Sequence, residues 1–174
     1  MQPTLETQRL ILRPFELSDA SRLKLLAGDK RIADVTANIP YPYPEGLAET
    51  WISSHAEKWS KYEMASFAII EKKSMILIGC ISIMNIKSSE GELGYWIGVE
   101  SWNHGYGTEA CKKIIEFCFN ELNLKRVHAH HLSRNPASGK VLAKCGLKHV
   151  DSGEAQCGYR HLNESIELYE KINT

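Results

Sequence analysis

Hydrophobic and polar residues change their spacing near the middle of the chain, within residues 94–110 (GYWIGVESWNHGYGTEA). Before this point apolar residues alternate with glycine and tryptophan: Leu93, Tyr95, Ile97 and Val99 against Gly94, Trp96 and Gly98. A period of two predicts a strand. From Ala110 the apolar residues return at helical spacing, which predicts a helix over Thr108–Leu122.

A glycine-bearing turn joins this strand to this helix. It consists of His104, Gly105, Tyr106, Gly107 and Thr108. The two glycines allow a sharp turn and the close approach of a ligand to the main chain. The helix that follows presents unpaired N–H groups and its positive dipole end. The pattern predicts a site for phosphate or pyrophosphate, with a purely structural turn as the alternative.

The same two periods predict the remaining elements. Strands are expected at Thr7–Arg13, Ser66–Ile70, Ile76–Ile86, Arg126–Leu132, Leu147–Val150 and Ser165–Tyr169, and helices at Ala20–Ala27, Glu45–Tyr62 and Asn135–Gly146. A loop follows Gly28 and includes the proline-rich Ile39–Pro44. Short turns favour antiparallel pairing of the strands before the central helix, and the helix crossover favours parallel pairing after it. We expect one α/β domain over residues 1–174, with a mixed sheet of about seven strands and about four helices.

Charge and hydropathy exclude several classes of protein. Lysine plus arginine equals aspartate plus glutamate, 21 each, so no overall field attracts nucleic acid or an anionic membrane. No apolar run approaches about 20 residues, and the start lacks the pattern of a signal peptide. We therefore expect a cytoplasmic protein that binds neither nucleic acid nor a membrane.

Cysteine and histidine are the candidate reactive and metal-binding residues. The five cysteines are odd in number and widely spaced, which favours reduced core residues over a nucleophile or disulfides: Cys80, Cys111, Cys118, Cys145 and Cys157. His128, His130 and His131 share one predicted strand, but no further ligand completes a set nearby. We expect structural histidines and no metal, with a zinc site as the alternative.

Three stretches resemble one known family. The run Trp-x-x-Gly-Tyr-Gly-Thr-Glu-Ala from Trp102 resembles the acetyl-CoA pyrophosphate loop of the GNAT-type N-acetyltransferases. Its usual form begins with Arg or Gln, and the tryptophan resembles the branch of the ribosomal-protein N-terminal acetyltransferases. The segment Glu6–Pro14 is similar to the opening strand of that branch. Asn135 and Ser138, followed by Lys-Cys-Gly-Leu, resemble the second cofactor-contacting helix of the family.

The resemblance implies the acyl-CoA N-acyltransferase fold, with a splayed pair of central strands and acetyl-CoA as co-substrate. It places the pantetheine arm along the main chain of Ile97, Gly98 and Val99, with the Val99 N–H facing the thioester carbonyl. It places the pyrophosphate on the amides from His104 to Thr108. Asn135 would contact the cofactor arm and also cap its helix.

Two residues are the catalytic candidates. Glu92, at the start of the central strand, would act as the general base through water, and its alternative is a solvated surface charge. Ser138 would protonate the leaving thiolate, and its alternative is an ordinary serine in the first turn of a helix. Many relatives have a tyrosine four residues before the glycine that ends this helix, where this chain has Leu142.

The expected reaction is direct acetyl transfer to a primary amine in a ternary complex. The branch resemblance favours a protein N-terminal amine. A small-molecule amine (polyamine, amino acid or antibiotic) and a non-catalytic acyl-CoA sensor are the alternatives. Tyr41, Tyr43, Tyr159 and His161 lie in loops beside the expected acceptor cleft. The sequence does not decide whether the protein forms a homodimer.

Overall fold

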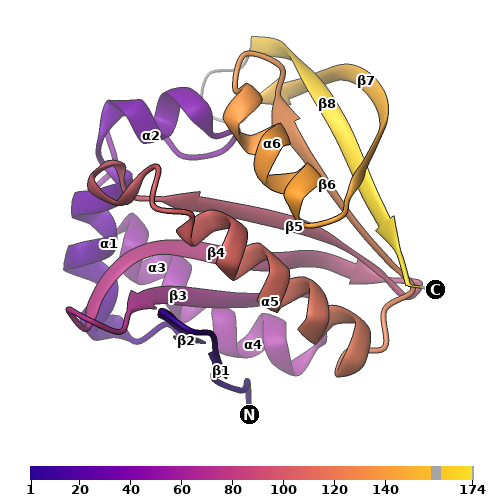
Figure 1. Cartoon of the computed structure of the whole chain (residues 1–174). Coiled ribbons are helices and arrows are strands. Elements are labelled where there is room, and N and C mark those ends of the chain that lie inside the picture. The colour runs from indigo at the N-terminus through magenta and orange to yellow at the C-terminus, as the bar shows by residue number, and fades with distance from the viewer. Residues whose placement is uncertain (158–161, 174) are drawn as a thin grey trace.

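The computed structural model describes residues 1–157 and 162–173, which form an eight-stranded mixed sheet in the order β1-β2-β3-β4-β5-β6-β8-β7 (Figure 1). The strands are β1 (Leu5–Glu6), β2 (Leu10–Pro14), β3 (Ala65–Glu71), β4 (Ile76–Lys87), β5 (Glu90–Ile97), β6 (Arg126–Leu132), β7 (Lys148–Cys157) and β8 (Leu162–Ile172). All neighbours are antiparallel except β5 and β6, which are parallel. The predicted fold class and strand directions are confirmed.

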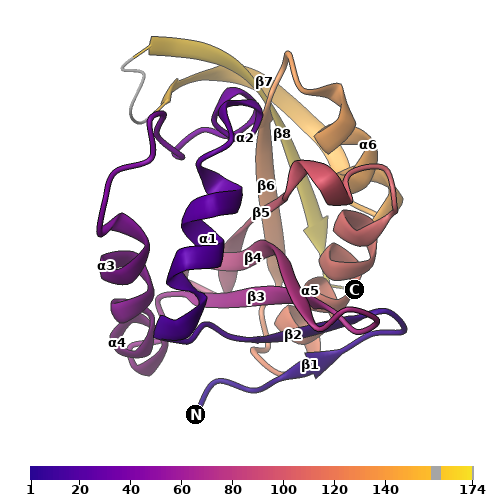
Figure 2. The ribbon, with the colours of Figure 1, turned by 90° about the vertical axis from the view of Figure 1, so that its left-hand side faces the viewer.

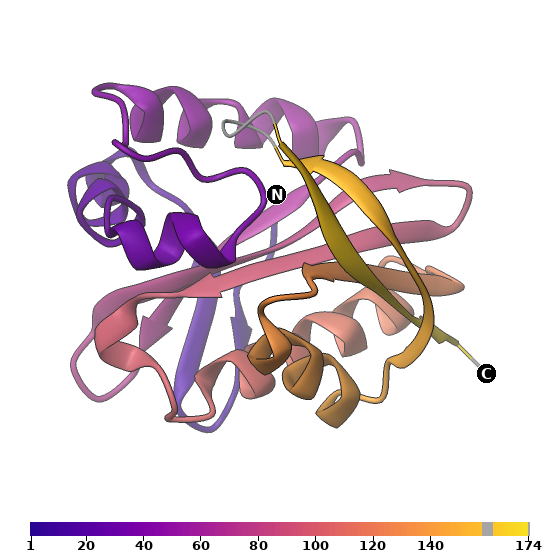
Figure 3. The same cartoon turned by 90° about the horizontal axis from the view of Figure 1, so that it is seen from above.

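Helices cover both faces of the sheet. They are α1 (Ala20–Ala27), α2 (Lys30–Val35), α3 (Leu47–Ser53), α4 (His55–Ser60), α5 (Tyr106–Asn120) and α6 (Pro136–Lys144), with two 3-10 turns, η1 (Leu17–Asp19) and η2 (Val99–Ser101). Figures 2 and 3 show α1, α3 and α4 on one side of the sheet and α5 and α6 on the other. No helix of the described residues is long and apolar enough to cross a membrane.

The alternation along β5 distributes its side chains between two cores. Leu93 and Ile97 are buried in the cluster that contains α5, whereas Trp96 packs against the cluster that contains α1 and α3. The predicted apolar stripe of α5 is buried throughout, from Ala110 to Cys118. Complete burial of one such side chain contributes about 1.5–3 kcal/mol, so this stripe fixes α5 firmly on the sheet.

The parallel pair β5 and β6 is splayed. Pairing covers only Glu90 with Arg126, Gly91 with Val127 and Glu92 with His128. Beyond these pairs β5 continues to Ile97 beside β4, whereas β6 continues beside β8 to Leu132. We call the region beyond Glu92 and His128, where the two strands no longer pair, the splay. Its presence agrees with the expected central feature of the fold.

The bounds of four predicted strands are wrong. Thr7–Arg13 is not one strand, because the Thr7 hydroxyl accepts the Leu10 N–H at 2.9 Å and closes a turn between β1 and β2. The central strand ends at Ile97, since the Gly98 N–H makes its last bond to Ile78 and Val99 begins η2. The last two strands, β7 and β8, are much longer than predicted, which reflects their pairing with each other.

The helices also differ from the prediction. The loop expected after Gly28 contains α2, which is capped by the Asp29 side chain accepting the Arg31 N–H at 2.9 Å. The helix expected over Glu45–Tyr62 is interrupted at Ser54 and forms α3 and α4. The central helix begins at Tyr106, two residues earlier than predicted, because Gly105 serves as its N-cap.

Four of the five cysteines are buried free thiols, as expected: Cys80, Cys111, Cys118 and Cys145. Burial raises the pKa of Cys80 to about 12, and that of Cys118 to about 12. A thiol that stays protonated is a weak nucleophile, so neither of these two is suited to nucleophilic catalysis. The side chain of Cys157 lies outside the described residues.

Candidate active site

The glycine turn forms an open helix N-terminus. Gly105 has φ +79°, a left-handed conformation that residues with a Cβ rarely adopt. The first backbone bond of α5 runs from the Glu109 N–H to the Gly105 carbonyl, at 3.1 Å. The N–H groups of the first turn, from Tyr106 to Thr108, therefore precede the intrahelical ladder. With the helix dipole, they make this turn suited to bind an anion.

The two glycines of the turn have different roles. A Cβ on Gly105 would meet only the Arg9 guanidinium, at 3.4 Å, so the space above it is open to a ligand. A Cβ on Gly107 would lie 3.1 Å from the ring of Tyr95. Gly107 therefore lets α5 approach β5 closely, a packing requirement that the sequence alone did not reveal.

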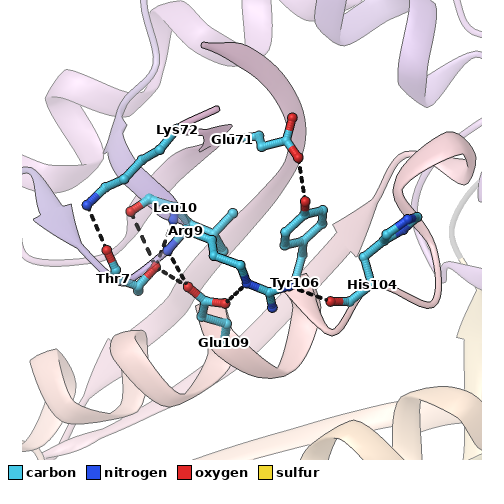
Figure 4. A network of polar contacts seen from close by, with 8 residues as sticks. All are labelled: Thr7, Arg9, Leu10, Glu71, Lys72, His104, Tyr106 and Glu109. Carbon is cyan, nitrogen blue, oxygen red and sulfur yellow. Dashed lines mark hydrogen bonds and ion pairs between the residues drawn. The ribbon is translucent and has the colours of Figure 1, made fainter. Parts of the chain in front are cut away.

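Side chains from the turn between β1 and β2 hold this loop in place (Figure 4). Arg9 donates from its Nη1 to the His104 carbonyl at 2.9 Å and from its Nε to Glu109 at 2.7 Å. Glu109 also accepts the Arg9 N–H at 2.8 Å and the Thr7 hydroxyl at 2.6 Å. Burial opposes ionisation of Glu109, but these donors outweigh it and lower the pKa of the carboxyl. Neither Arg9 nor Glu109 stands out in the sequence as part of a site, because their partners are distant along the chain.

Tyr106, the aromatic residue of the turn, also contacts Arg9. The Arg9 guanidinium lies 4.7 Å from the centre of the Tyr106 ring, and the Tyr106 hydroxyl donates to Glu71.

A hollow of about 270 Å³ adjoins this turn and is lined by Arg22, Glu71, Ser74, Ile76, Ile78, Glu100, Ser101, His104 and Tyr106. A larger hollow of about 550 Å³, between α5 and the C-terminal end of α6, is lined by none of the candidate catalytic residues.

Trp102 has a structural role at the position where Arg or Gln is usual. Its indole Nε1 donates to the Ile97 carbonyl at 2.6 Å, and its backbone N–H donates to the Val99 carbonyl at 3.1 Å. These two bonds close the connection between β5 and the glycine turn.

Gly98 is buried, and a Cβ there would lie 2.9 Å from Leu26 of α1. The Gly98 N–H is already bonded to Ile78, which leaves Val99 as the first backbone beyond the ladder.

Asn135 does not cap α6, contrary to expectation. Its side chain makes no capping bond and instead donates from Nδ2 to the Val35 carbonyl, at 3.3 Å. The neighbouring Arg134 donates to the Asp34 carbonyl and pairs with Glu164 at 3.0 Å. These side chains thus join α2 to the segment between β6 and α6, and the ribbons of the two segments lie side by side in Figure 2. Asn135 keeps its predicted place at the helix start, and Gly146, with φ +84°, ends the helix region as expected.

Ser138, in the first turn of α6, meets a partner that the sequence analysis overlooked. Its Oγ lies 3.3 Å from the Tyr95 hydroxyl of β5. Burial raises the pKa of Tyr95, so this hydroxyl keeps its proton at neutral pH. The signal was present in the sequence, because Tyr95 shares a strand face with Leu93 and Ile97, but only the fold brings that face to α6.

Glu92 lies at the start of the splay and is held by two donors. Asn85 donates to its Oε2 at 2.8 Å, and His130 Nδ1 lies 3.0 Å from its Oε1. The hydrogen bond from His130 is the main cause that lowers the pKa of Glu92; burial opposes it and Asn85 assists it. The Glu92 side chain is 18% exposed, so it is not a freely solvated surface charge. The structure thus brings Glu92 together with His130, which the sequence analysis had treated as structural.

The two candidate acceptor residues that the structure describes, Tyr41 and Tyr43, differ in their surroundings. Tyr41 is 55% exposed, and Tyr43 packs against the apolar cluster of α1 and α3. Tyr159 and His161 lie outside the described residues. No group of three or more His, Cys, Asp or Glu side chains in the described ranges could hold a metal ion.

Comparison with known proteins decides the family. A model of the acetyltransferase (GNAT) domain matches residues 9–148. The chain belongs to this family. It is an acetyl-CoA-dependent N-acetyltransferase, as the three matching stretches of sequence predicted. A relative with 31% identity over 141 residues is the uncharacterized N-acetyltransferase p20 of Bacillus licheniformis, and the alignment covers 80% of this chain and 79% of that one.

Solved structures of GNAT enzymes share the fold. A ribosomal-protein-S5-alanine acetyltransferase from Vibrio fischeri has a TM-score of 0.85 at 23% identity, covering 99% of this chain and 97% of that one. The spermidine N-acetyltransferase from Vibrio cholerae, in complex with CoA and spermine, has a TM-score of 0.80 at 16% identity, covering 95% and 96%. At these identities the likeness concerns the fold. GNAT enzymes of this shape therefore act on both protein and small-molecule amines.

Proposed function

We propose that this GNAT enzyme transfers the acetyl group of acetyl-CoA to an N-terminal α-amine of a protein, by direct attack in a ternary complex. The observation that carries the proposal is the arrangement of polar groups about the splay. Glu92 and His130 face the side of the sheet covered by α1 and α3, and the Tyr95 and Ser138 hydroxyls face the side of α5 and α6. A thioester between them has a proton acceptor on one side and a proton donor on the other.

Binding of the cofactor follows from the main chain. The pyrophosphate would accept hydrogen bonds from the N–H groups between His104 and Thr108, above the open face of Gly105. The pantetheine arm would lie along Ile97 to Val99, beside the splay, where β5 lacks a neighbour on one edge. The Asn135 amide would contact this arm from the start of α6. No metal ion is needed for this chemistry.

The transfer itself requires one bond to form and one to break. The amine nitrogen attacks the thioester carbonyl carbon, and the Val99 N–H would stabilise the negative oxygen that develops there. The C–S bond then breaks, the thiolate takes a proton from Ser138, and the former amine loses a proton to the base. An α-amine has a pKa near 8, so about a fifth of it is already neutral at physiological pH.

The choice of a protein amine is supported by the ribosomal-protein acetyltransferase of the same fold and by the motif around Trp102. Residues 34–37 pack at the Leu132 end of β6. They are joined to the β6–α6 connection by Arg134 and Asn135, and Ala37 packs against Leu132 and Ile166. This segment covers the Leu132 end of the splay, beside the start of α6.

The test has two stages. Calorimetric titration with acetyl-CoA, with CoA and ATP as controls, should show micromolar binding of acetyl-CoA and much weaker binding of ATP. Release of free thiol is then measured with peptides that begin with Ala or Ser, with the same peptides blocked at the α-amine, with spermine and with an aminoglycoside.

Turnover of the free peptides alone, with acetylation at the α-amine by mass spectrometry, would support the proposal. Turnover of spermine or the aminoglycoside alone would reassign the enzyme to small-molecule amines. Binding of acetyl-CoA without turnover of any amine would favour the acyl-CoA sensor.

A further inference from the structure

Glu92 is poorly placed to be the group that deprotonates the acceptor directly. Each of its carboxylate oxygens already accepts a hydrogen bond, from Asn85 and from His130. It lies five positions before Ile97 on the same strand, which at about 3.3 Å each is about 16 Å along the main chain of β5. The side chain of the base, with any water ahead of it, must span this main-chain distance, so a group that lies further along the splay than Glu92 is favoured.

His130 is such a group. It lies two residues beyond His128, which is level with Glu92, and is therefore about 7 Å further along the splay. From His130, β6 leads directly to Asn135 and Ser138, where the resemblance places the thiol end of the cofactor. The His130 side chain is 32% exposed, nearly twice the 18% of Glu92. The two side chains are in contact at 3.0 Å, and of this pair His130 lies further along the splay and is the more exposed.

The contact with Glu92 also determines which nitrogen of His130 can react. An ionised carboxylate only accepts hydrogen bonds, so the ring proton is on Nδ1, 3.0 Å from Glu92 Oε1. The lone pair is therefore on Nε2, which has no hydrogen-bond partner among the residues that the structure describes. A neutral imidazole with a carboxylate behind it is a good proton acceptor, because the carboxylate stabilises the imidazolium that forms.

We propose that His130, oriented by Glu92, is the general base of this enzyme, and that Glu92 acts only through it as a positioning residue. The inference rests on the proposed function. As the amine nitrogen forms its bond to the carbonyl carbon, its proton passes to His130 Nε2, directly or through one water. The C–S bond breaks, and the thiolate receives a proton from the Ser138 and Tyr95 hydroxyls. His130 and the hydroxyls exchange protons with solvent before the next cycle, so the reaction balances.

Several charged groups surround this pair on the same face of the sheet. They are Lys87 on β4, Glu90 and Glu92 on β5, Arg126 and His128 on β6, Lys148 and Asp151 on β7, and Glu164 and Glu170 on β8. Arg126 is paired with both Glu90 and Glu170, at 2.8 and 2.7 Å. Leu168 lies directly opposite His130 on β8. Glu92 is thus the one carboxylate that contacts His130 among the described residues.

The test compares four variants on an acceptor that the wild type acetylates. His130→Asn keeps a donor near the Nδ1 position but has no second nitrogen to take a proton. We expect its kcat to fall by about a hundredfold or more, with acetyl-CoA affinity unchanged by calorimetry. The acidic limb of its kcat/KM profile should disappear. His130→Ala should regain part of its kcat when imidazole is added, and Glu92→Gln should lose less than His130→Asn.

The matched control is His149→Asn, on β7, whose ring pairs with Glu167 at 2.8 Å. It should retain the wild-type kcat. A kcat of His130→Asn within threefold of the wild type would overturn the inference about His130 and leave the proposed function intact. So would a greater loss in Glu92→Gln with no imidazole rescue of His130→Ala, which would make Glu92 the base. Absence of wild-type turnover with every amine would overturn the proposed function and the inference with it.

Discussion

The Tyr95 hydroxyl lies 3.3 Å from the Ser138 Oγ, and this contact links β5 to the first turn of α6. The ring of Tyr95 also packs on Gly107, in the first turn of α5. One side chain therefore contacts the two helix starts that flank the splay. Because its hydroxyl keeps its proton, it can donate to Ser138 while Ser138 donates to the thiolate.

Removing this hydroxyl should affect catalysis more than binding. In Tyr95→Phe the ring still packs on Gly107, but Ser138 loses a donor. We expect kcat to fall about tenfold, with acetyl-CoA affinity unchanged by calorimetry. Combination with Ser138→Ala should add little further loss, since both act on one proton. Tyr62→Phe, at an exposed position, is the control. Fully additive losses would show that the two hydroxyls act separately.

Gly105→Val should abolish tight binding of acetyl-CoA. The change places a side chain where phosphate must approach and forces a β-branched residue to φ +79°. Gly46→Val is a closely matched control, because Gly46 also starts a helix in the left-handed conformation, with φ +74° and open space around it. Both variants should lose about 1–2 kcal/mol of stability. Affinity measured by calorimetry should fall more than tenfold only in Gly105→Val, and equal affinities would remove the anion site from this turn.

Glu109→Gln should destabilise the protein in a pH-dependent way. The carboxylate accepts bonds from Thr7 and Arg9, and its replacement should cost about 1–2 kcal/mol at pH 7. The pKa of Glu109 is lower in the folded state, so its contribution is present above the unfolded value near 4.3 and is lost as the pH falls further. Urea unfolding at pH 7 and pH 3.5 should therefore show a smaller difference from wild type at the lower pH. The exposed Glu121→Gln should change neither value.

His55 should make the protein less stable in mild acid. Burial lowers its pKa to about 4, and neither ring nitrogen has a hydrogen-bond partner among the described residues. The unfolded chain takes up a proton near pH 6.5 that the folded chain resists. Stability should therefore fall between about pH 6.5 and pH 4, by at most about 3 kcal/mol.

His55→Phe tests this origin of the acid sensitivity. The ring packs edge-on against Trp51 and Phe15, contacts that phenylalanine can keep. The variant should remain folded and lose that part of the pH dependence when its urea unfolding is followed from pH 7 to pH 4. An unchanged slope would assign the acid sensitivity to other groups.

The motif around the glycine turn could be predicted because its information is local. The change from strand period to helix period, and the two glycines between them, lie within one stretch of chain. The end of β5 could not be predicted in the same way. Its alternation continues to Val99, but the last bond of the ladder is made to Ile78, a residue of another strand. Similarly, Asn135 has the composition of a cap, yet its amide is used by Val35, 100 residues away in sequence.

The sequence by itself determined the class of fold, the family and the glycine turn between strand and helix, since periodicity, glycine placement and motif spacing are properties of neighbouring residues. The tertiary structure alone decided which side chains act together. Arg9 and Glu109 are separated by 100 residues, Tyr95 and Ser138 by 43, and Glu92 and His130 lie on different strands. Their meeting depends on strand order, on register and on the point where β5 and β6 cease to pair. These are set by the packing of the whole chain, because no local pattern specifies which distant segments bury their apolar faces together.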